Sequence, residues 1–305
     1  MTIKLSTLLN ICAFVVILNS SALAQQSADP HFNARVDTPA FTKNFPRVLF
    51  DEAHNNSETP NGRYKPFADL LFNDGYQLAL NRKPFTKESL KTSKILVIVN
   101  PLGAEDVDDD GADGQAFTAE ECEIISDWIR GGGALLLIVD SAPHSLAAGN
   151  LAQGLGIEVS RGYATDPANS EKGANDPSVI VYSRDNQLLA AHSITNGRSD
   201  AERVNKVVVF NGQLLKGPTG AEAFLKLADT AVDSAAPEKS GSAAGRAQGI
   251  AFRLGKGRVV VVADAAMLSA QVTGSENLRF GINSEDFDNK QLTLNIMHWL
   301  SGLLK

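Results

Sequence analysis

Polar side chains with acid–base or metal-binding capacity follow four apolar runs of the sequence. In chain order these groups are Asp51, Glu52, His54 and Asn55; Asn100; Asp140, Ser141 and His144; and Asp264. Carboxylates and imidazoles that meet in a cleft suit a hard-to-borderline metal ion or acid–base chemistry on a polar substrate. The same residue types also cap the helices that follow strands, so a purely structural role stays open for each group.

Two roles can be distinguished within this set. The catalytic candidates are Glu52, His54, Asp140 and His144, and the ligand-binding candidates are Asp51, Asn55, Asn100, Ser141 and Asp264. Ser141 stands on a strand-to-helix turn, where hydrolases place a nucleophile. However, Val139 and Pro143 occupy the positions that glycine takes in a nucleophile elbow, which disfavours that role.

An acidic loop matches the first half of a calcium-binding pattern. Asp106, Asp108 and Asp110 stand at positions one, three and five, and Gly111 stands at position six. The bidentate glutamate of position twelve is absent, because Phe117 occupies that position. A calcium site and a solvated acidic turn therefore remain alternative interpretations.

The first half of the chain alternates apolar strands with helical patterns. Residues 47–50, 76–80, 94–99 and 134–139 are predicted as strands, and Thr118 with Glu121 forms a capping box that predicts the start of a helix. A helix is also expected over about 145–155. This rhythm favours right-handed crossovers and a parallel sheet whose strand ends share one edge.

The second half reads differently. Short strands are predicted at 179–182 and 207–210, residues 222–232 suit either helix or strand, and residues 233–247 read as a flexible loop. Residues 249–254 and 258–263 flank Gly255-Lys256-Gly257, which predicts a β-hairpin. A last helix starts near Asp288, and His298 lies off its apolar stripe in a structural or solvent-facing position. The predicted fold is an open, mostly parallel α/β sheet with helices on both faces and a hairpin near the C-terminus.

Several stretches of the chain, taken in order, resemble the class I glutamine-amidotransferase-like superfamily. They are Phe50–His54, the run from Phe117 through Ile138, His192–Gly197, Gly255–Arg258, and Leu294–Leu300. The nearest match is a branch of unknown function related to ThuA-like and gliding-motility ABC-associated proteins. The resemblance implies a flavodoxin-like fold over residues 46–305.

The sequence departs from the catalytic members of that superfamily at the nucleophile. A glutamine amidotransferase carries a cysteine on the turn that here reads Asp140 to His144, and no cysteine is near. Glutamine hydrolysis through a thiolate is therefore not expected. The resemblance implies a fold and says little about chemistry, because function lies in sites rather than folds.

Residues 1–24 have the layout of a secretory signal peptide. Lys4 precedes an apolar stretch from Leu5 to Leu18, and Ala22-Leu23-Ala24 is a small-x-small cleavage site. The apolar stretch is shorter than the roughly 20 residues of a membrane span. We therefore expect a secreted or periplasmic protein whose N-terminus after cleavage is Gln25, with residues 25–45 as a polar lead-in and no membrane insertion.

Composition limits the partners. The net charge is −7 and no basic cluster stands out, which argues against nucleic acid and anionic membrane surfaces. Beyond the signal peptide the chain keeps one cysteine, Cys122, so no internal disulfide is expected, and its helical, apolar setting predicts a buried structural thiol.

Three functions remain open from the sequence. The first is an exported binding module for a small polar ligand, with a carbohydrate suggested by the ThuA-like relatives. The second is a metal-assisted hydrolase that uses Asp51, Glu52, His54, Asp140 and His144. The third is a scaffold without ligand. No cofactor follows with certainty, although a divalent metal or calcium fits the second function, and no protein partner is indicated.

Overall fold

The computed structural model describes residues 26–235, 241–274 and 278–305. The predicted signal peptide and the central part of the predicted loop 233–247 lie outside these ranges. Among the helices that the described residues form, none has the length and apolar character needed to cross a bilayer.

Five parallel strands form the centre of the main sheet. In spatial order they are β3 (Gln77–Asn81), β2 (Arg47–Asp51), β4 (Ile95–Val99), β5 (Ala134–Ile138) and β13 (Gly257–Val262). The first strand of the domain thus lies between the second and the third, which is the flavodoxin-like order. The predicted α/β fold is confirmed.

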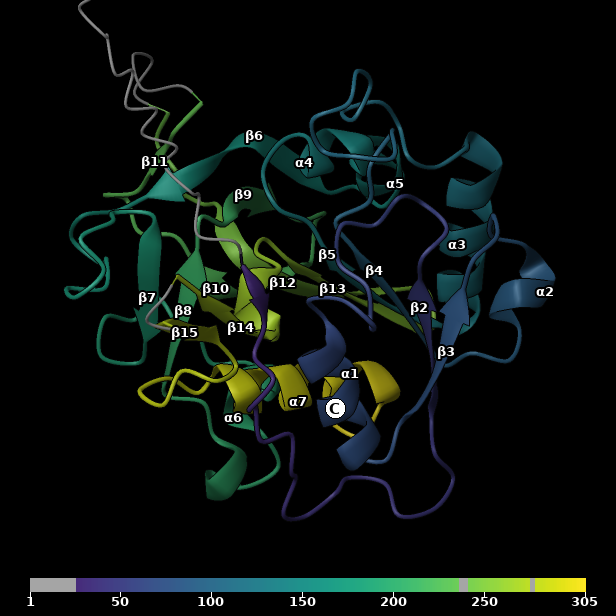
Figure 1. Cartoon of the computed structure of the whole chain (residues 1–305), viewed down its shortest axis with the longest axis horizontal. Helices are drawn as coiled ribbons and strands as arrows, with labels where there is room; N and C mark the ends of the chain where they lie inside the picture. Colours follow the sequence, from purple (N-terminus) through teal and green to yellow (C-terminus); the bar gives the residue numbers. More distant parts are fainter. Residues whose placement is uncertain (1–25, 236–240, 275–277) are drawn as a thin grey trace, which may run out of the picture.

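Helices cover both faces of this sheet (Figure 1). The side chains of Ile95, Val97 and Val99 pack on one face with α1 (Lys65–Asn73) and α7 (Asn289–Ser301). Leu96 and Ile98 pack on the other face with α3 (Ala119–Gly131) and α5 (Gly149–Gly154). Strand β4 is apolar at every position because both of its faces are buried.

The second half of the chain extends the sheet with antiparallel strands. The predicted hairpin is confirmed: β12 (Ala247–Leu254) pairs with β13 through a turn in which Gly255 has a φ of 61°. Beyond it lie β9 (Gln213–Lys216), β6 (Glu158–Thr165) and β11 (Val232–Asp233), and β10 (Glu222–Lys226) also pairs with β12. The ambiguous segment 222–232 therefore begins as a strand, because β12 offers it a pairing edge.

Two small sheets and several short helices complete the fold. β7 (Val179–Ser183) pairs with β8 (Lys206–Phe210), and β1 (Ser27–Ala28) pairs with β14 (Ala270–Thr273), which pairs with β15 (Leu278–Gly281). The short helices are α2 (Lys87–Leu90), α4 (His144–Ala147), α6 (Ser193–Asn196), η1 (Asp200–Glu202) and η3 (Ala266–Leu268). The predicted helix 145–155 is thus divided into α4 and α5.

The polar lead-in packs against the rest of the fold. Its strand β1 pairs with β14, and the ring of Phe41 lies edge-on to Tyr76 with ring centroids 5.1 Å apart. Phe32 and Val36 pack against the buried side chains of Leu70 and Leu294. Residues before the predicted domain boundary therefore contribute to the core.

The capping box of α3 forms as predicted. The Thr118 hydroxyl accepts a hydrogen bond from the Glu121 amide, and the Glu121 carboxylate accepts one from the Thr118 amide at 3.0 Å. The helix ends at Gly132, whose φ of 120° is unfavourable for residues with a side chain. This start and end fix the direction in which Glu121 points.

Candidate functional site

The order of the central strands creates a switch point between β2 and β4. The chain leaves these neighbouring strands toward different sides of the sheet, so their loops diverge at the carboxyl ends of the strands, where open α/β sheets commonly bind ligands. Asn55 and Asn100 stand in these loops with positive φ angles of 49° and 44°. Leu102 N–H donates to the His54 carbonyl and Ser57 N–H donates to the Asn100 carbonyl, each at 3.0 Å, which joins the two loops.

A closed cluster of three side chains lies beneath the β2 loop. The His54 ring contacts Asp51 Oδ2 through Nδ1 at 2.8 Å and Glu121 Oε1 through Nε2 at 3.0 Å. All three side chains are buried, and the rings of Phe85 and Phe117 lie on the imidazole with centroids 5.0 Å and 4.4 Å away. Both ring nitrogens of His54 therefore contact carboxylates of the protein.

The charge state of this closed cluster follows from opposing effects. Burial lowers the pKa of His54, but the hydrogen bonds and charges of Asp51 and Glu121 outweigh it, so the pKa is raised above 6.5. Burial raises the pKa of Glu121, but hydrogen bonds from the Thr118 and Phe85 backbones and from His54 have the larger combined effect. The pKa of Glu121 is therefore lowered from its ordinary value. A protonated His54 between two carboxylates is the arrangement that these directions favour.

A second group of side chains lies at the ends of β4 and β5. We call it the switch-edge cluster: Ser57, Glu58, Arg63, Asn100, Asp140 and His144. Asn100 Nδ2 donates to Asp140 Oδ2 at 2.6 Å, and the Asp140 amide donates to Asn100 Oδ1 at 2.8 Å. The Ala265 amide donates to Asp140 Oδ1 at 2.7 Å. Three strand ends are thereby joined around Asp140.

Glu58 is the most unusual member of the switch-edge cluster. Its residue is only 3% exposed, and Arg63 Nη2 donates to its Oε1 at 2.5 Å. Its other oxygen, Oε2, is buried without a hydrogen-bond partner. Burial, followed by the charge of Asp140, raises the pKa of Glu58 to about 7, against the lowering effects of Arg63 and of a hydrogen bond with the Asn100 side chain. A carboxyl group that holds a proton near neutral pH is typical of functional sites.

His144 and Ser57 form the accessible part of the cluster. Ser57 Oγ lies 2.9 Å from His144 Nε2, and both residues are half-buried. Burial lowers the pKa of His144, Arg63 lowers it further, and the charge of Asp140 and a backbone hydrogen bond with Ser141 oppose the shift without reversing it. The imidazole is therefore neutral at neutral pH.

Asp264 has a structural environment. It is buried, and its carboxylate accepts hydrogen bonds from the Phe210 amide at 2.7 Å and the Ala266 amide at 2.8 Å. Burial and the charge of Asp140 raise its pKa well above the ordinary value, despite these hydrogen bonds. It ends β13 as a turn-forming residue next to the cluster.

The structure brings together some of the predicted site residues and separates others. Asn100, Asp140 and His144 share the switch-edge cluster, whereas His54 and Asp51 belong to the closed cluster. The Glu52 carboxylate accepts a hydrogen bond from Arg82 at 2.8 Å instead of facing Asp140. Asn55 is exposed in the loop, and Ser141 contributes its backbone to His144. A single set containing Glu52, His54, Asp140 and His144 is not formed.

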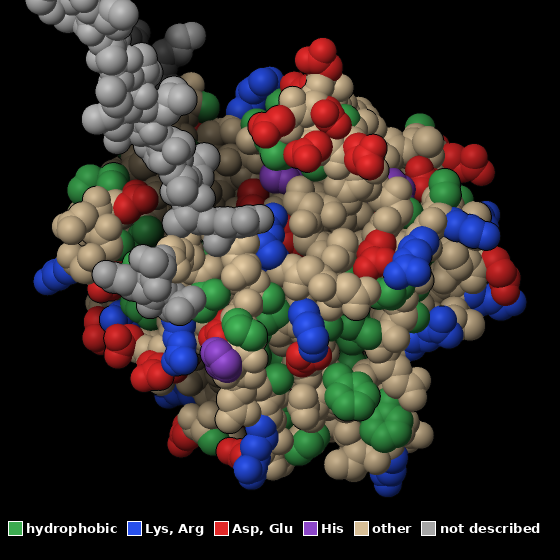
Figure 2. All heavy atoms as spheres, in the orientation of Figure 1, with side chains coloured by type: hydrophobic (Ala, Val, Ile, Leu, Met, Phe, Trp, Pro, Cys, Tyr) green, Lys and Arg blue, Asp and Glu red, His purple; other side chains and the backbone are tan. Residues whose placement is uncertain are grey.

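The acidic loop lacks the predicted calcium geometry. Acidic side chains gather on this protruding loop between β4 and α3 (Figure 2), and Asp106, Asp108 and Asp110 are all exposed. The Asp109 carboxylate accepts a hydrogen bond from the Asp106 amide, which closes a turn. Within residues 26–235, 241–274 and 278–305, no three or more His, Cys, Asp or Glu side chains are grouped to hold a metal ion. The first-half calcium pattern therefore folds as a solvated turn.

Four further residues lie differently from their sequence-based predictions or were missed. Cys122 is half-buried rather than buried, because it stands at the margin of the α3 stripe, and burial raises the pKa of its thiol to about 11. Ser57 and Glu58 belong to a turn-rich segment whose composition signals only a loop. Glu121 was recognised as a capping residue, but its second contact, with His54, depends on the packing of α3.

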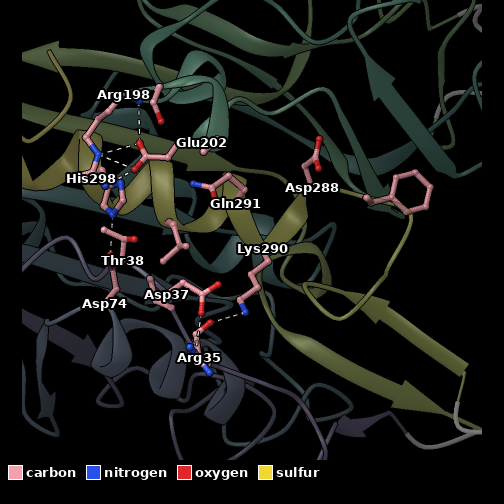
Figure 3. Close-up of a pocket in the computed structure, with 15 residues that line it drawn as sticks. Arg35, Asp37, Thr38, Asp74, Arg198, Glu202, Asp288, Lys290, Gln291 and His298 are labelled. Atoms are coloured by element: carbon pink, nitrogen blue, oxygen red, sulfur yellow. Dashed lines mark hydrogen bonds and ion pairs between the residues drawn. The ribbon is translucent and has the colours of Figure 1, made fainter.

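A hollow of about 520 Å³ lies away from this edge, between the lead-in, α7 and the end of α1 (Figure 3). His298 is buried there, and its Nε2 contacts Asp74 Oδ2 at 2.8 Å, so its role is structural rather than solvent-facing. The charges around it are paired locally: Arg198 with Glu202, and Arg35 with Asp37. Lys290 donates to the backbone carbonyls of residues 33 and 35.

No protein-family model matches the chain, and no curated protein matches it. Solved structures do share its fold. The mmIFT52 N-terminal domain is 17% identical with a TM-score of 0.60, over 83% of this chain and 97% of that one. Cytoplasmic protein STM1381 from Salmonella typhimurium LT2 is 14% identical with a TM-score of 0.50, over 84% of this chain and 99% of that one.

A putative ThuA-like protein from Parabacteroides merdae ATCC 43184 is also similar. It is 12% identical with a TM-score of 0.45, over 84% of this chain and 90% of that one. Identities this low show a common fold and no common activity. The comparisons therefore show a shared α/β fold, and the resemblance to the glutamine-amidotransferase-like superfamily stays a prediction from the sequence motifs.

Proposed function

We propose that the chain binds a small polar, hydroxyl-bearing ligand at the switch-edge cluster. The observation that carries this proposal is the buried Oε2 of Glu58, which forms no hydrogen bond of normal geometry although the Asn100 side chain interacts with the same carboxyl group. An unsatisfied buried carboxyl oxygen costs roughly 1–3 kcal/mol, and a ligand group that donates to it removes this cost. A ligand hydroxyl both donates and accepts, so it suits the carboxyl group in either protonation state.

The remaining groups of the cluster support a neutral polyol such as a carbohydrate. Ser57, Arg63 and His144 are half-buried and present hydrogen-bonding groups of different kinds. An anionic ligand is disfavoured. The negative charge of Asp140 already repels a negative charge on Glu58, and an anion would add to this repulsion. Polar groups of this variety fix the orientation of a small ligand more than they add affinity.

Export belongs to the same proposal. The signal-peptide pattern of residues 1–24 supports a periplasmic or secreted location, where a binding module meets external sugars. Relation to the ThuA-like and gliding-motility branch is the finer part of the proposal and rests on the sequence motifs. The metal-assisted alternative is weakened by the contact of Glu52 with Arg82 and of His54 with Glu121.

Binding of a panel of neutral mono- and disaccharides, measured by isothermal titration calorimetry, tests the proposal. We expect a sugar to bind, and Glu58→Ala to weaken that binding by at least about tenfold, which corresponds to roughly 1.4 kcal/mol. Glu52→Gln is the matched control, since Glu52 lies outside the cluster and contacts Arg82. If no sugar binds, or if Glu58→Ala binds as well as the unchanged protein, the chain is better described as a scaffold.

A further inference from the structure

The hydrogen bond between Ser57 and His144 has the geometry of a nucleophile and its base. The 2.9 Å distance from Oγ to Nε2 lies within the range over which an imidazole takes a hydroxyl proton. Both residues are half-buried, whereas His54 of the closed cluster is buried.

The ring of His144 faces the Ser57 hydroxyl through Nε2. The donor and acceptor roles of this contact depend on the tautomer of the ring: with the ring hydrogen on the other nitrogen, Nε2 keeps its lone pair toward the hydroxyl and can take its proton. This tautomer is the one that the inference requires.

Ser57 is also held in place by its backbone. Its amide donates to the Asn100 carbonyl at 3.0 Å, and the preceding side chain, Asn56, donates through Nδ2 to the Val99 carbonyl at 3.0 Å. Both acceptors belong to the end of β4, in the centre of the sheet. A reactive side chain supported by a rigid element meets the positional precision that catalysis needs.

We propose that Ser57 is an acyl-accepting nucleophile, with His144 as its general base, and that the switch-edge cluster hydrolyses esters. We expect the acyl group or the alcohol of the ester to carry further hydroxyl groups, and this part of the inference rests on the proposed function. The nucleophile itself rests only on the geometry of Ser57 and His144.

The reaction needs only the ester and water. Ser57 Oγ forms a bond to the carbonyl carbon while its proton passes to His144 Nε2. The bond from that carbon to the leaving alkoxide then breaks, and His144 returns the proton to it, releasing the alcohol. Water attacks the acyl-serine in the same way, which releases the carboxylic acid and restores Ser57. Arg63, which pairs with Glu58, is the positively charged side chain of the cluster.

A fluorophosphonate probe and p-nitrophenyl acetate test this inference on the full chain. We expect the probe to label one site, mapped by peptide mass spectrometry to Ser57, and p-nitrophenyl acetate to be hydrolysed. Ser57→Ala is expected to lose the label, and His144→Gln to slow labelling by about 100-fold or more. The controls Ser199→Ala and His31→Gln change exposed residues outside the cluster and should label at the unchanged rate.

A second variant covers the case in which Ser57→Ala does not fold. Ser57→Cys keeps a nucleophile beside His144, and we expect iodoacetamide to alkylate it faster than Cys122, whose thiol pKa is raised to about 11. Sugar binding by Ser57→Ala separates this inference from the proposed function. If a sugar binds but the probe does not label Ser57, the nucleophile is rejected and the proposed function stands. If the probe labels Ser57 but no sugar binds, the carbohydrate ligand is rejected and the nucleophile stands. Labelling at another residue, or equal alkylation of both cysteines, overturns the inference.

Discussion

Two histidines follow β2 and β5, the strands on either side of β4, at the same edge of the sheet, yet their surroundings are opposite. His54 lies between the carboxylates of Asp51 and Glu121, packs against the rings of Phe85 and Phe117, and is buried. His144 is half-buried and contacts the hydroxyl of Ser57, and the same cluster contains Glu58, whose Oε1 pairs with Arg63. Burial alone lowers the pKa of both imidazoles, and the two adjacent carboxylates reverse the direction for His54 only.

The difference separates stability from reactivity. An imidazole whose nitrogens both contact carboxylates has no free group for a ligand, so the closed cluster holds the β2 loop and α3 together. The open cluster leaves the half-buried Ser57 hydroxyl and His144 imidazole next to the buried carboxyl group of Glu58, and the proposed ligand binding depends on these groups. The residue types at the strand ends did not distinguish the closed cluster from the open one, since each cluster contains an aspartate and a histidine.

The largest effect is expected from the closed cluster. His54→Ala leaves two buried carboxylates without their cation, and removing one partner of a buried ion pair costs about 3–5 kcal/mol of unfolding free energy. His144→Ala removes one hydrogen bond at a half-buried position and should cost about 1 kcal/mol. Urea denaturation of the two variants measures both values, and equal losses would contradict the division into closed and open clusters.

Glu58 is expected to produce the next largest effect, as a dependence of stability on pH. Its pKa rises from 4.5 to about 7 on folding, so the folded chain holds a proton that the unfolded chain has released. Stability therefore falls as pH rises from about 4.5 to about 7, by roughly 2–3 kcal/mol. Glu58→Gln should flatten this part of the curve, and an unchanged slope in denaturation series would exclude a raised pKa.

The two histidines should contribute to stability with opposite pH dependence. Because the folded pKa of His54 is raised, its contribution is present below 6.5 and is lost as pH rises through the folded pKa. Because the folded pKa of His144 is lowered, stability is lost as pH falls from 6.5 through the folded pKa. NMR titration of the ring protons measures both, with His54→Gln and His144→Gln to assign signals, and the reverse order of pKa values would refute the contrast.

The smallest effect is expected at Cys122. The thiol is half-buried at the edge of the α3 stripe, beside the closed cluster but without a role in it. Cys122→Ser should therefore lower the unfolding free energy by about 1 kcal/mol or less and leave sugar binding and Ser57 labelling unchanged. Thermal unfolding together with probe labelling checks this, and loss of labelling would mean that α3 communicates with the switch-edge cluster.

The sequence by itself determined the parallel centre of the fold and the residues at its strand ends. Continuous apolar runs such as Ile95–Val99 predict strands buried on both faces, and parallel strands place Asn100 and Asp140 at one edge. The capping box of Thr118 and Glu121 was equally visible, because it depends on residues three apart. Local spacing carries all of these signals.

Tertiary structure decided which of those strand-end residues face one another. Glu52 and His54 are two residues apart, yet one contacts Arg82 and the other Glu121, and both partners come from other elements. Ser57 and Glu58 belong to a loop without periodicity, and only the docking of that loop on β4 and β5 brings them to His144 and Asp140. Residues 222–226 became a strand because β12 offered an unpaired edge. Such contacts join residues far apart in sequence, and no local pattern encodes them.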